Sequence, residues 1–96
     1  MTHAQLVRQI MELAWLLGHE PFPVQRNENA KALQLFRSGS PDVIVCTRSG
    51  RFIGLEAKRG RDRLSRKQKE VRDRLPDGSF FEARPDTYVE ILEGLK

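Results

Sequence analysis

The sequence predicts one small α/β domain over residues 1–96, with a small mixed sheet flanked by helices. Three observations support this fold class. Apolar residues recur at helical spacing near the start of the chain, two compact β-branched runs lie between residues 42 and 58, and helical and strand patterns alternate after them. A domain of this length buries about 60–65% of its unfolded surface, so its core is thin.

The first predicted element is a helix over residues 3–17. Thr2 and Gln5 form a capping-box pattern before it, and Gly18 supplies a stop after it. Its main apolar stripe consists of Leu6, Ile10, Leu13 and Leu17. A second stripe of Val7, Met11 and Trp15 widens the apolar face, which either the core of the same chain or a second subunit could bury.

A turn leading into an extended segment is expected over residues 19–26, because Pro21 and Pro23 fix the backbone there. Residues 27–37 are ambiguous between a short helix and a loop, since their apolar residues have helical spacing but polar flanks. Residues 38–41 carry the sequence Ser-Gly-Ser-Pro and interrupt the pattern.

Two strands are predicted next, over residues 42–46 and 52–58. The link over residues 47–51 is short and contains glycine, so the strands should form an antiparallel hairpin. A helix, a strand and a helix follow in the rest of the chain.

The helix after the hairpin begins at Ser65, where Gln68 completes a second capping box, and it ends before Pro76. The strand is expected over residues 79–83. The final helix is expected over residues 85–95, because proline suits a first helical turn.

The register of the predicted hairpin brings charged side chains to one face of the sheet. With a five-residue loop, Cys46 faces Phe52. In the same register Asp42 faces Glu56, and Lys58 points to the same side because side chains alternate along a strand. Opposed Cβ atoms lie about 4.5–5.5 Å apart, so the carboxylates should repel each other. Lys58 alone could offset this in a structural ion cluster, or a divalent cation could, since Mg²⁺ binds carboxylate oxygens.

A cation at that point could act on a phosphodiester. It would neutralise charge on the phosphate, orient an attacking water and lower the pKa of that water. Lys58 would hold or help deprotonate the water, or stabilise the transition state. The backbone carbonyl of Ala57, between Glu56 and Lys58, is a further candidate ligand. The predicted catalytic residues are therefore Asp42, Glu56 and Lys58.

The charge distribution indicates a polyanionic partner. The formal net charge is +4, and residues 58–74 contain nine basic and three acidic side chains. A solvated helix face is one explanation, but such density directly after a candidate catalytic strand favours nucleic acid. The candidate DNA-binding residues are Arg59, Arg61, Arg63, Arg66 and Lys67.

Composition also bears on the cellular compartment. Cys46 is the single cysteine, so no intrachain disulfide can form, which favours a reducing cytosol. Charged residues interrupt the first apolar positions, so no signal peptide is expected. The longest uncharged apolar stretch, residues 13–18, is far shorter than a membrane span. We expect a cytoplasmic protein that does not bind a membrane.

Several of these segments together resemble a known family. Ser40-Pro41-Asp42 followed by Glu56-Ala57-Lys58 is the PD-(D/E)xK nuclease signature. The context of that signature is similar to the VRR-NUC (virus-type replication-repair nuclease) family, most strongly over residues 39–75. The similar segments are residues 39–42, 50–52, 55–58, 64–68 and 81–84.

That resemblance implies a restriction-endonuclease-like PD-(D/E)xK core and metal-dependent endonuclease activity on DNA. The implied substrates are branched structures such as Holliday junctions, and the implied cofactor is Mg²⁺, with Mn²⁺ as the alternative. Small stand-alone members are similar to homodimeric resolvases and are commonly phage-borne, which would place the protein in the host-cell cytosol. Gln68 matches the family's glutamine, which lies near the metal site and supports the lysine, a role compatible with helix capping.

One departure from the family's pattern concerns the first helix. The family usually carries a metal-binding glutamate near the start of that helix, whereas residues 2–6 contain none. Glu12 is the acid inside the helix and a candidate for this ligand, although a plain solvent-facing role is the alternative. His3, Glu20 and Glu28 are the other candidates. In every other respect His3 and His19 are interpreted as surface residues.

Two other classes of function fit the same sequence. A non-catalytic nucleic-acid-binding module would keep the acids as a structural cluster with Lys58, and chelating agents would not affect it. An interaction protein would use its basic face to bind an acidic partner, and a steep salt dependence of DNA binding would contradict that function.

Overall fold

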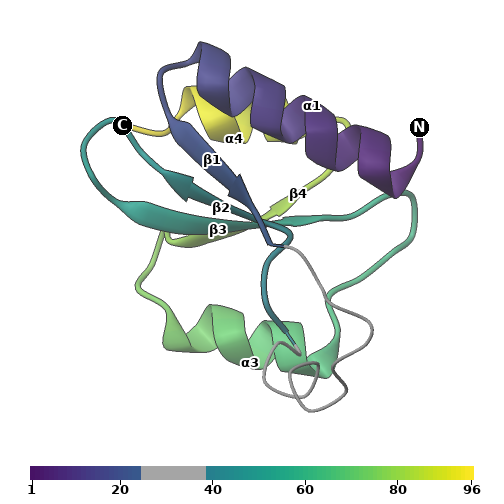
Figure 1. Cartoon of the computed structure of the whole chain (residues 1–96). Helices are drawn as coiled ribbons and strands as arrows, with labels where there is room; N and C mark the ends of the chain where they lie inside the picture. The colour runs from purple at the N-terminus through teal and green to yellow at the C-terminus, as the bar shows by residue number, and fades with distance from the viewer. Residues whose placement is uncertain (25–38) are drawn as a thin grey trace.

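The computed structural model describes residues 1–24 and 39–96, so the ambiguous segment 27–37, with Glu28, lies outside the described residues. The elements in chain order are α1 (His3–Leu16), β1 (Glu20–Pro23), β2 (Val43–Cys46), β3 (Phe52–Ala57), α3 (Arg66–Arg74), β4 (Phe80–Ala83) and α4 (Tyr88–Glu93). They form a mixed α/β domain, as predicted, around a four-stranded sheet of order β1-β2-β3-β4 (Figure 1).

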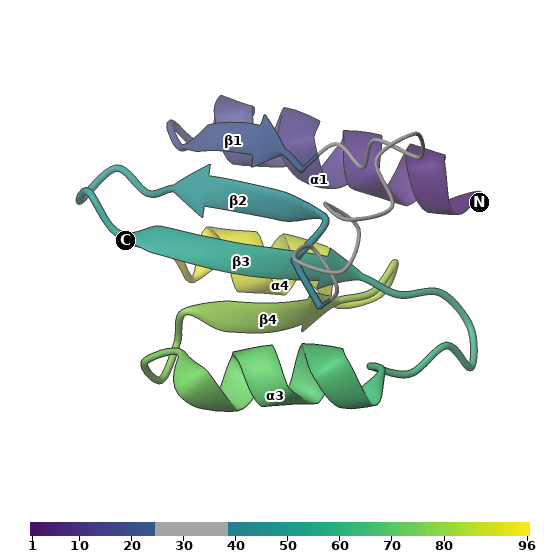
Figure 2. The same ribbon diagram turned by 60° about the horizontal axis from the view of Figure 1, so that its bottom comes forward.

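Helices α1 and α4 cover one face of the sheet, and α3 lies on the other side (Figure 1). Figure 2 shows that α3 runs alongside β4. The core lies between the sheet and the α1–α4 layer. Its largest fully buried side chains are Leu6, Ile10, Val43, Val45, Ile53, Leu55 and Leu92. Because these residues alternate along β2 and β3, the residues between them, including Glu56, face the α3 side.

The predicted hairpin is confirmed, and its predicted register is confirmed from Val43 to Cys46. Strands β2 and β3 pair antiparallel, with Cys46 opposite Phe52 and Ile44 opposite Gly54. Strand β4 pairs parallel to β3, and β1 pairs antiparallel to β2 as an edge strand. The prediction gave an extended segment in place of β1, and its prolines at positions 21 and 23 suit an edge strand.

Both predicted capping boxes are present. Thr2 and Gln5 cap α1, and Ser65 and Gln68 cap α3, each with both reciprocal bonds to the backbone. The final helix begins at Tyr88 rather than at residue 85. The residues before it form a turn, because the N–H groups of Thr87 and Tyr88 both donate to the carbonyl of Arg84.

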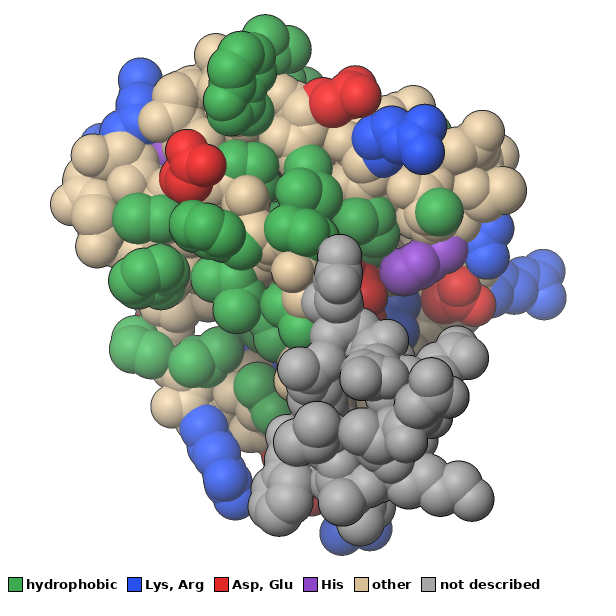
Figure 3. All heavy atoms as spheres, viewed as in Figure 1, with side chains coloured by type: hydrophobic (Ala, Val, Ile, Leu, Met, Phe, Trp, Pro, Cys, Tyr) green, Lys and Arg blue, Asp and Glu red, His purple; other side chains and the backbone are tan. Residues whose placement is uncertain are grey.

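The second apolar stripe of α1 is divided between core and surface. Val7 and Met11 pack against the core, whereas Trp15 is 65% exposed. Other exposed large hydrophobic residues include Leu16, Phe22 and Phe52. Figure 3 shows hydrophobic side chains gathered below α1 on this face, beside the grey atoms.

The surface interpretation of His19 is wrong, because only 2% of the residue is exposed. Gly18 has a φ of 89° and turns the chain inward at the end of α1. The backbone N–H of Arg48 then donates to Nδ1 of His19 over 3.1 Å. Burial, and next the positive charge of Arg48, lower the pKa of His19 below its ordinary value of 6.5.

Within residues 1–24 and 39–96, no helix combines the length and the apolar character that crossing a membrane requires.

Candidate functional site

Two tight backbone contacts fix the position of the segment that precedes Asp42. Gly39 has a φ of 85°, and a Cβ there would lie 2.8 Å from Cγ and 2.9 Å from the carbonyl oxygen of Lys67. A Cβ on Gly54 would lie 3.0 Å from Cγ of Pro41. The segment before Asp42 therefore passes tightly between α3 and β3, which fixes the backbone from which this aspartate projects.

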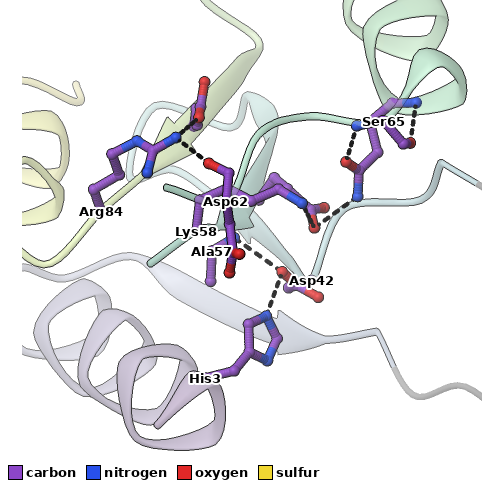
Figure 4. Close-up of polar contacts among 10 residues, drawn as sticks. His3, Asp42, Ala57, Lys58, Asp62, Ser65 and Arg84 are labelled. Atoms are coloured by element: carbon purple, nitrogen blue, oxygen red, sulfur yellow. Dashed lines mark hydrogen bonds and ion pairs between the residues drawn. The ribbon is translucent and has the colours of Figure 1, made fainter. Parts of the chain in front are cut away.

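Asp42 continues the hairpin one residue beyond β2. Its N–H donates to the carbonyl of Leu55 over 3.1 Å, one residue short of the predicted partner Glu56, and the regular strand pairing ends at Val43 opposite Leu55. Oδ2 of Asp42 accepts from the N–H of Ala57 over 2.9 Å and lies 3.2 Å from Nε2 of His3 (Figure 4). With 13% of its side chain exposed, this carboxylate lies at the rim of the site.

Glu56 lies deeper and is only 2% exposed. Nε2 of Gln68 donates to Oε1 of Glu56 over 2.8 Å, and Nζ of Lys58 lies 3.8 Å from the same oxygen. Burying a carboxylate is costly unless it is paired and hydrogen-bonded, and these contacts reduce that cost. The structure thus brings Gln68 and Lys58 to Glu56, and it brings Asp42 to the backbone of the next residue, Ala57.

Gln68 caps α3, as predicted, and its amide nitrogen contacts Glu56 rather than Lys58, the residue that the family resemblance implied it would support. Its Oε1 accepts from the N–H of Ser65 over 2.8 Å, and its N–H donates to Oγ of Ser65 over 3.1 Å. The same amide group uses its nitrogen on Glu56. A helix cap and the candidate site thus share one side chain.

The remaining candidate residues lie around this cluster or away from it. Arg61, Arg63, Arg66 and Lys67 are exposed. Arg59 is half-buried, and its Nη1 donates to the carbonyl of Met1 over 3.1 Å. Glu12 is exposed on α1, nine residues beyond His3, which is about 13 Å of helix. The structure thus brings His3, and not Glu12, to Asp42.

Two contacts were not singled out from the sequence. The approach of His3 to Asp42 was one of several alternatives, and no local pattern distinguished it. The interaction of Arg84 with Glu82 and with the loop after β3 was not anticipated at all. The contacts of His3 with Asp42 and of Arg84 with the loop join segments far apart in sequence. Glu82 lies two residues before Arg84, and the alternation of side chains was the one signal that could have paired these two.

The donor set suits a hard divalent cation. The two carboxylates and the Ala57 carbonyl are oxygen ligands, and Mg²⁺ completes its octahedron with waters and phosphate oxygens. His3 would add a nitrogen donor, which suits transition metals. In the part of the chain that the structure describes, no three side chains of His, Cys, Asp or Glu converge on one point, so a cation would depend on a backbone carbonyl, water and substrate.

Comparison with known proteins does not assign the site. No family model matches the sequence, no curated protein matches it, and no solved structure matches the fold. Function is therefore inferred from the residues themselves.

Proposed function

We propose that this protein is a divalent-metal-dependent nuclease that hydrolyses phosphodiester bonds in DNA. The observation that carries the proposal is the meeting of Asp42, Glu56 and Lys58 beside one hairpin, with Lys58 Nζ 3.8 Å from Glu56 Oε1. Their spacing in sequence is that of the PD-(D/E)xK signature. The small mixed sheet flanked by helices supports the restriction-endonuclease-like core and the VRR-NUC membership that belong to this proposal.

The residues would divide the chemistry as follows. Asp42, Glu56 and the Ala57 carbonyl would hold a divalent cation, which supplies charge neutralisation and a water of lowered pKa when bound. Lys58 is 15% exposed at its side chain, so its ammonium group can reach a phosphate oxygen or the attacking water from a partly desolvated position. Gln68 keeps Glu56 oriented through its 2.8 Å hydrogen bond.

The basic residues support DNA as the substrate. Arg61 and Arg63 are exposed directly after Lys58, and Arg66 and Lys67 follow at the start of α3. Such residues bind phosphates without reading base sequence, so selection would depend on DNA shape. The proposal also includes branched DNA as the substrate and a homodimer as the assembly, because the family resemblance implies both. It includes a cytoplasmic location, because the lone cysteine favours a reducing compartment.

The primary test is cleavage of junction, flap and linear duplex DNA with and without Mg²⁺. Lys58→Ala should lower cleavage about 100-fold or more while DNA binding and the circular dichroism spectrum stay unchanged, because the amine acts on the reacting phosphate. Lys69→Ala is the matched control, since Lys69 is exposed on α3. Wild-type cleavage by the Lys58 variant would remove Lys58 from the mechanism.

A second test concerns the first-helix ligand. His3→Ala should weaken Mn²⁺ binding roughly 10- to 100-fold, measured from the electron paramagnetic resonance signal of free Mn²⁺, because Nε2 lies beside Asp42. Glu12→Gln should bind Mn²⁺ like the wild type, since Glu12 is exposed elsewhere on α1. The reverse result would give the role to Glu12.

A non-catalytic DNA-binding module is the second candidate function. One observation favours it: Glu56 is paired with Gln68 and Lys58, and Asp42 with Ala57 and His3, so protein groups alone accommodate both acids. Such a module would bind DNA equally with and without EDTA and would cleave no substrate in either Mg²⁺ or Mn²⁺.

A further inference from the structure

The connection between β3 and α3 is strongly basic. We call residues 58–64 the basic loop; four of its seven residues are basic, Lys58, Arg59, Arg61 and Arg63, and Asp62 is its one acid. Like charges so close together repel one another, which favours an open, variable loop. A fixed arrangement of these cations therefore needs an anchor outside the loop.

Arg84 provides such an anchor from the end of β4. Its Nη1 donates to the carbonyl of Gly60 over 3.0 Å, and its Nη2 donates to the carbonyl of Asp62. The same Nη2 contacts a carboxylate oxygen of Glu82. Figure 4 shows the Arg84 side chain reaching from the end of β4 toward the Asp62 segment, on the Lys58 side of the site. One guanidinium group thus joins two carbonyls of the basic loop to the sheet.

The backbone of Arg84 is itself held firmly. Its N–H donates to Oγ1 of Thr87 over 3.0 Å, and its carbonyl accepts from the N–H groups of Thr87 and Tyr88 at the start of α4. One residue earlier, the carbonyl of Ala83 accepts from the N–H of Lys58 over 2.9 Å. The guanidinium group therefore projects from the segment between β4 and α4 toward a loop whose first residue, Lys58, is hydrogen-bonded to the last residue of β4.

The charge pairing and the low exposure of Arg84 favour a role in holding the basic loop over direct binding of a phosphate. Glu82 lies against Arg84 and offsets its charge, and only 26% of the Arg84 side chain is exposed. Arg61 and Arg63 are exposed and lie in the loop that Arg84 holds. A planar fork that donates to two carbonyls at once is a property of arginine that lysine does not share.

We propose that Arg84 is a positioning residue, which holds the basic loop in the conformation that presents Arg61 and Arg63 to DNA phosphates. The phosphate half of this inference rests on the proposed nuclease function. The anchoring half does not, so the two halves have separate tests.

Trypsin tests the anchoring half on the whole protein without DNA. The bond between Arg63 and Leu64 is protected, because Leu64 is 8% exposed and must leave its packing before the protease can bind. Arg84→Lys should speed cleavage of this bond about tenfold, since lysine keeps the charge and loses the bidentate hydrogen bonds.

The bond between Arg8 and Gln9, in the middle of α1, serves as the internal control. Acceleration confined to Arg63–Leu64 supports the anchor. Equal acceleration at both bonds, which signals global unfolding, or an unchanged rate at Arg63–Leu64 would overturn it. Glu82→Gln is a second variant that keeps both loop carbonyls on Arg84, and it should leave cleavage at Arg63–Leu64 within about twofold of the wild type; a tenfold rise there would overturn the carbonyl anchor.

DNA tests the second half. Arg84→Lys should raise KM for a DNA substrate about tenfold and leave kcat within about twofold, because the loop binds phosphates away from the reacting bond. If Arg84→Lys binds DNA with wild-type affinity, a positive charge at position 84 is sufficient and the hydrogen-bond geometry of arginine is not needed. That result would overturn the phosphate half of the proposal. Absence of DNA cleavage by the wild type would refute the nuclease and leave the trypsin result to decide the anchor.

Discussion

At the scale of one residue, Glu56 depends on two determinants, its position on β3 and the contact that α3 makes with it through Gln68. Its face of the sheet and its approach to Asp42 and Lys58 followed from the alternation of side chains and a five-residue loop. Its 2% exposure did not follow, because burial depends on α3 covering that face. The approach of His3 depended on where α1 crosses the sheet, which is a packing outcome that no local pattern encodes.

His19 leads to a prediction at the same scale. Its folded-state pKa is lowered, mainly by burial, so the native state binds fewer protons than the unfolded state just below pH 6.5. Stability from neutral His19 is therefore complete above pH 6.5 and is lost as the pH falls from there through the lowered folded-state pKa.

His19→Asn separates this effect from all other titrations, because asparagine can accept from the N–H of Arg48 and does not titrate. Urea unfolding at pH 7.5 and pH 5.5 should show a larger loss of unfolding free energy for the wild type than for this variant. Equal losses would contradict the assignment.

At the scale of elements, prediction succeeded where the signal is local. Capping boxes set the starts of α1 and α3, and the glycine-containing loop set the β2–β3 register. The prediction did not identify β1 as a strand, because its two prolines are unusual in strands and fit here at the edge of the sheet. It also placed the start of α4 too early, because a hydrogen-bonded turn occupies the expected first helical turn. The parallel pairing of β4 with β3 is a long-range contact that no local pattern specifies.

The approach of the Gly39 segment to α3 leads to a prediction about elements. Gly39→Ala should lower the free energy of unfolding by about 1–3 kcal/mol, because its positive φ is strained for alanine and its Cβ would lie 2.9 Å from the Lys67 carbonyl oxygen. Gly50→Ala is the matched control, since Gly50 has a φ of 87° and nothing lies within 4 Å of a Cβ there.

Comparison of the two alanine variants by urea denaturation isolates the steric contact from the backbone strain. The Gly39 variant should be the less stable of the two and should also cleave DNA more slowly, because displacement of this segment moves Asp42. If the two variants have the same stability, the contact with α3 contributes nothing.

At the scale of the whole molecule, the candidate DNA-binding residues of the basic loop and of the start of α3 should act through long-range charge. Arg63→Ala and Lys67→Ala should each weaken DNA binding at low salt and reduce the slope of log K against log salt by about 1. Lys96→Ala is the control, because its carbonyl accepts from Oγ of Ser49 in the β2–β3 turn, at the opposite end of β3 from the basic loop (Figure 1). Binding measured by fluorescence anisotropy at several salt concentrations decides between these outcomes, and a slope that no variant changes would contradict the assignment.

The shared use of Gln68 has a consequence for the whole protein. Fraying of the first turn of α3 would withdraw the amide from a buried carboxylate at the same moment, so helix end and acidic group gain or lose order as one unit. The hairpin alone therefore cannot supply the hydrogen bond that Glu56 accepts from Gln68. In the proposed nuclease, the candidate site would be complete only after the downstream helix has docked.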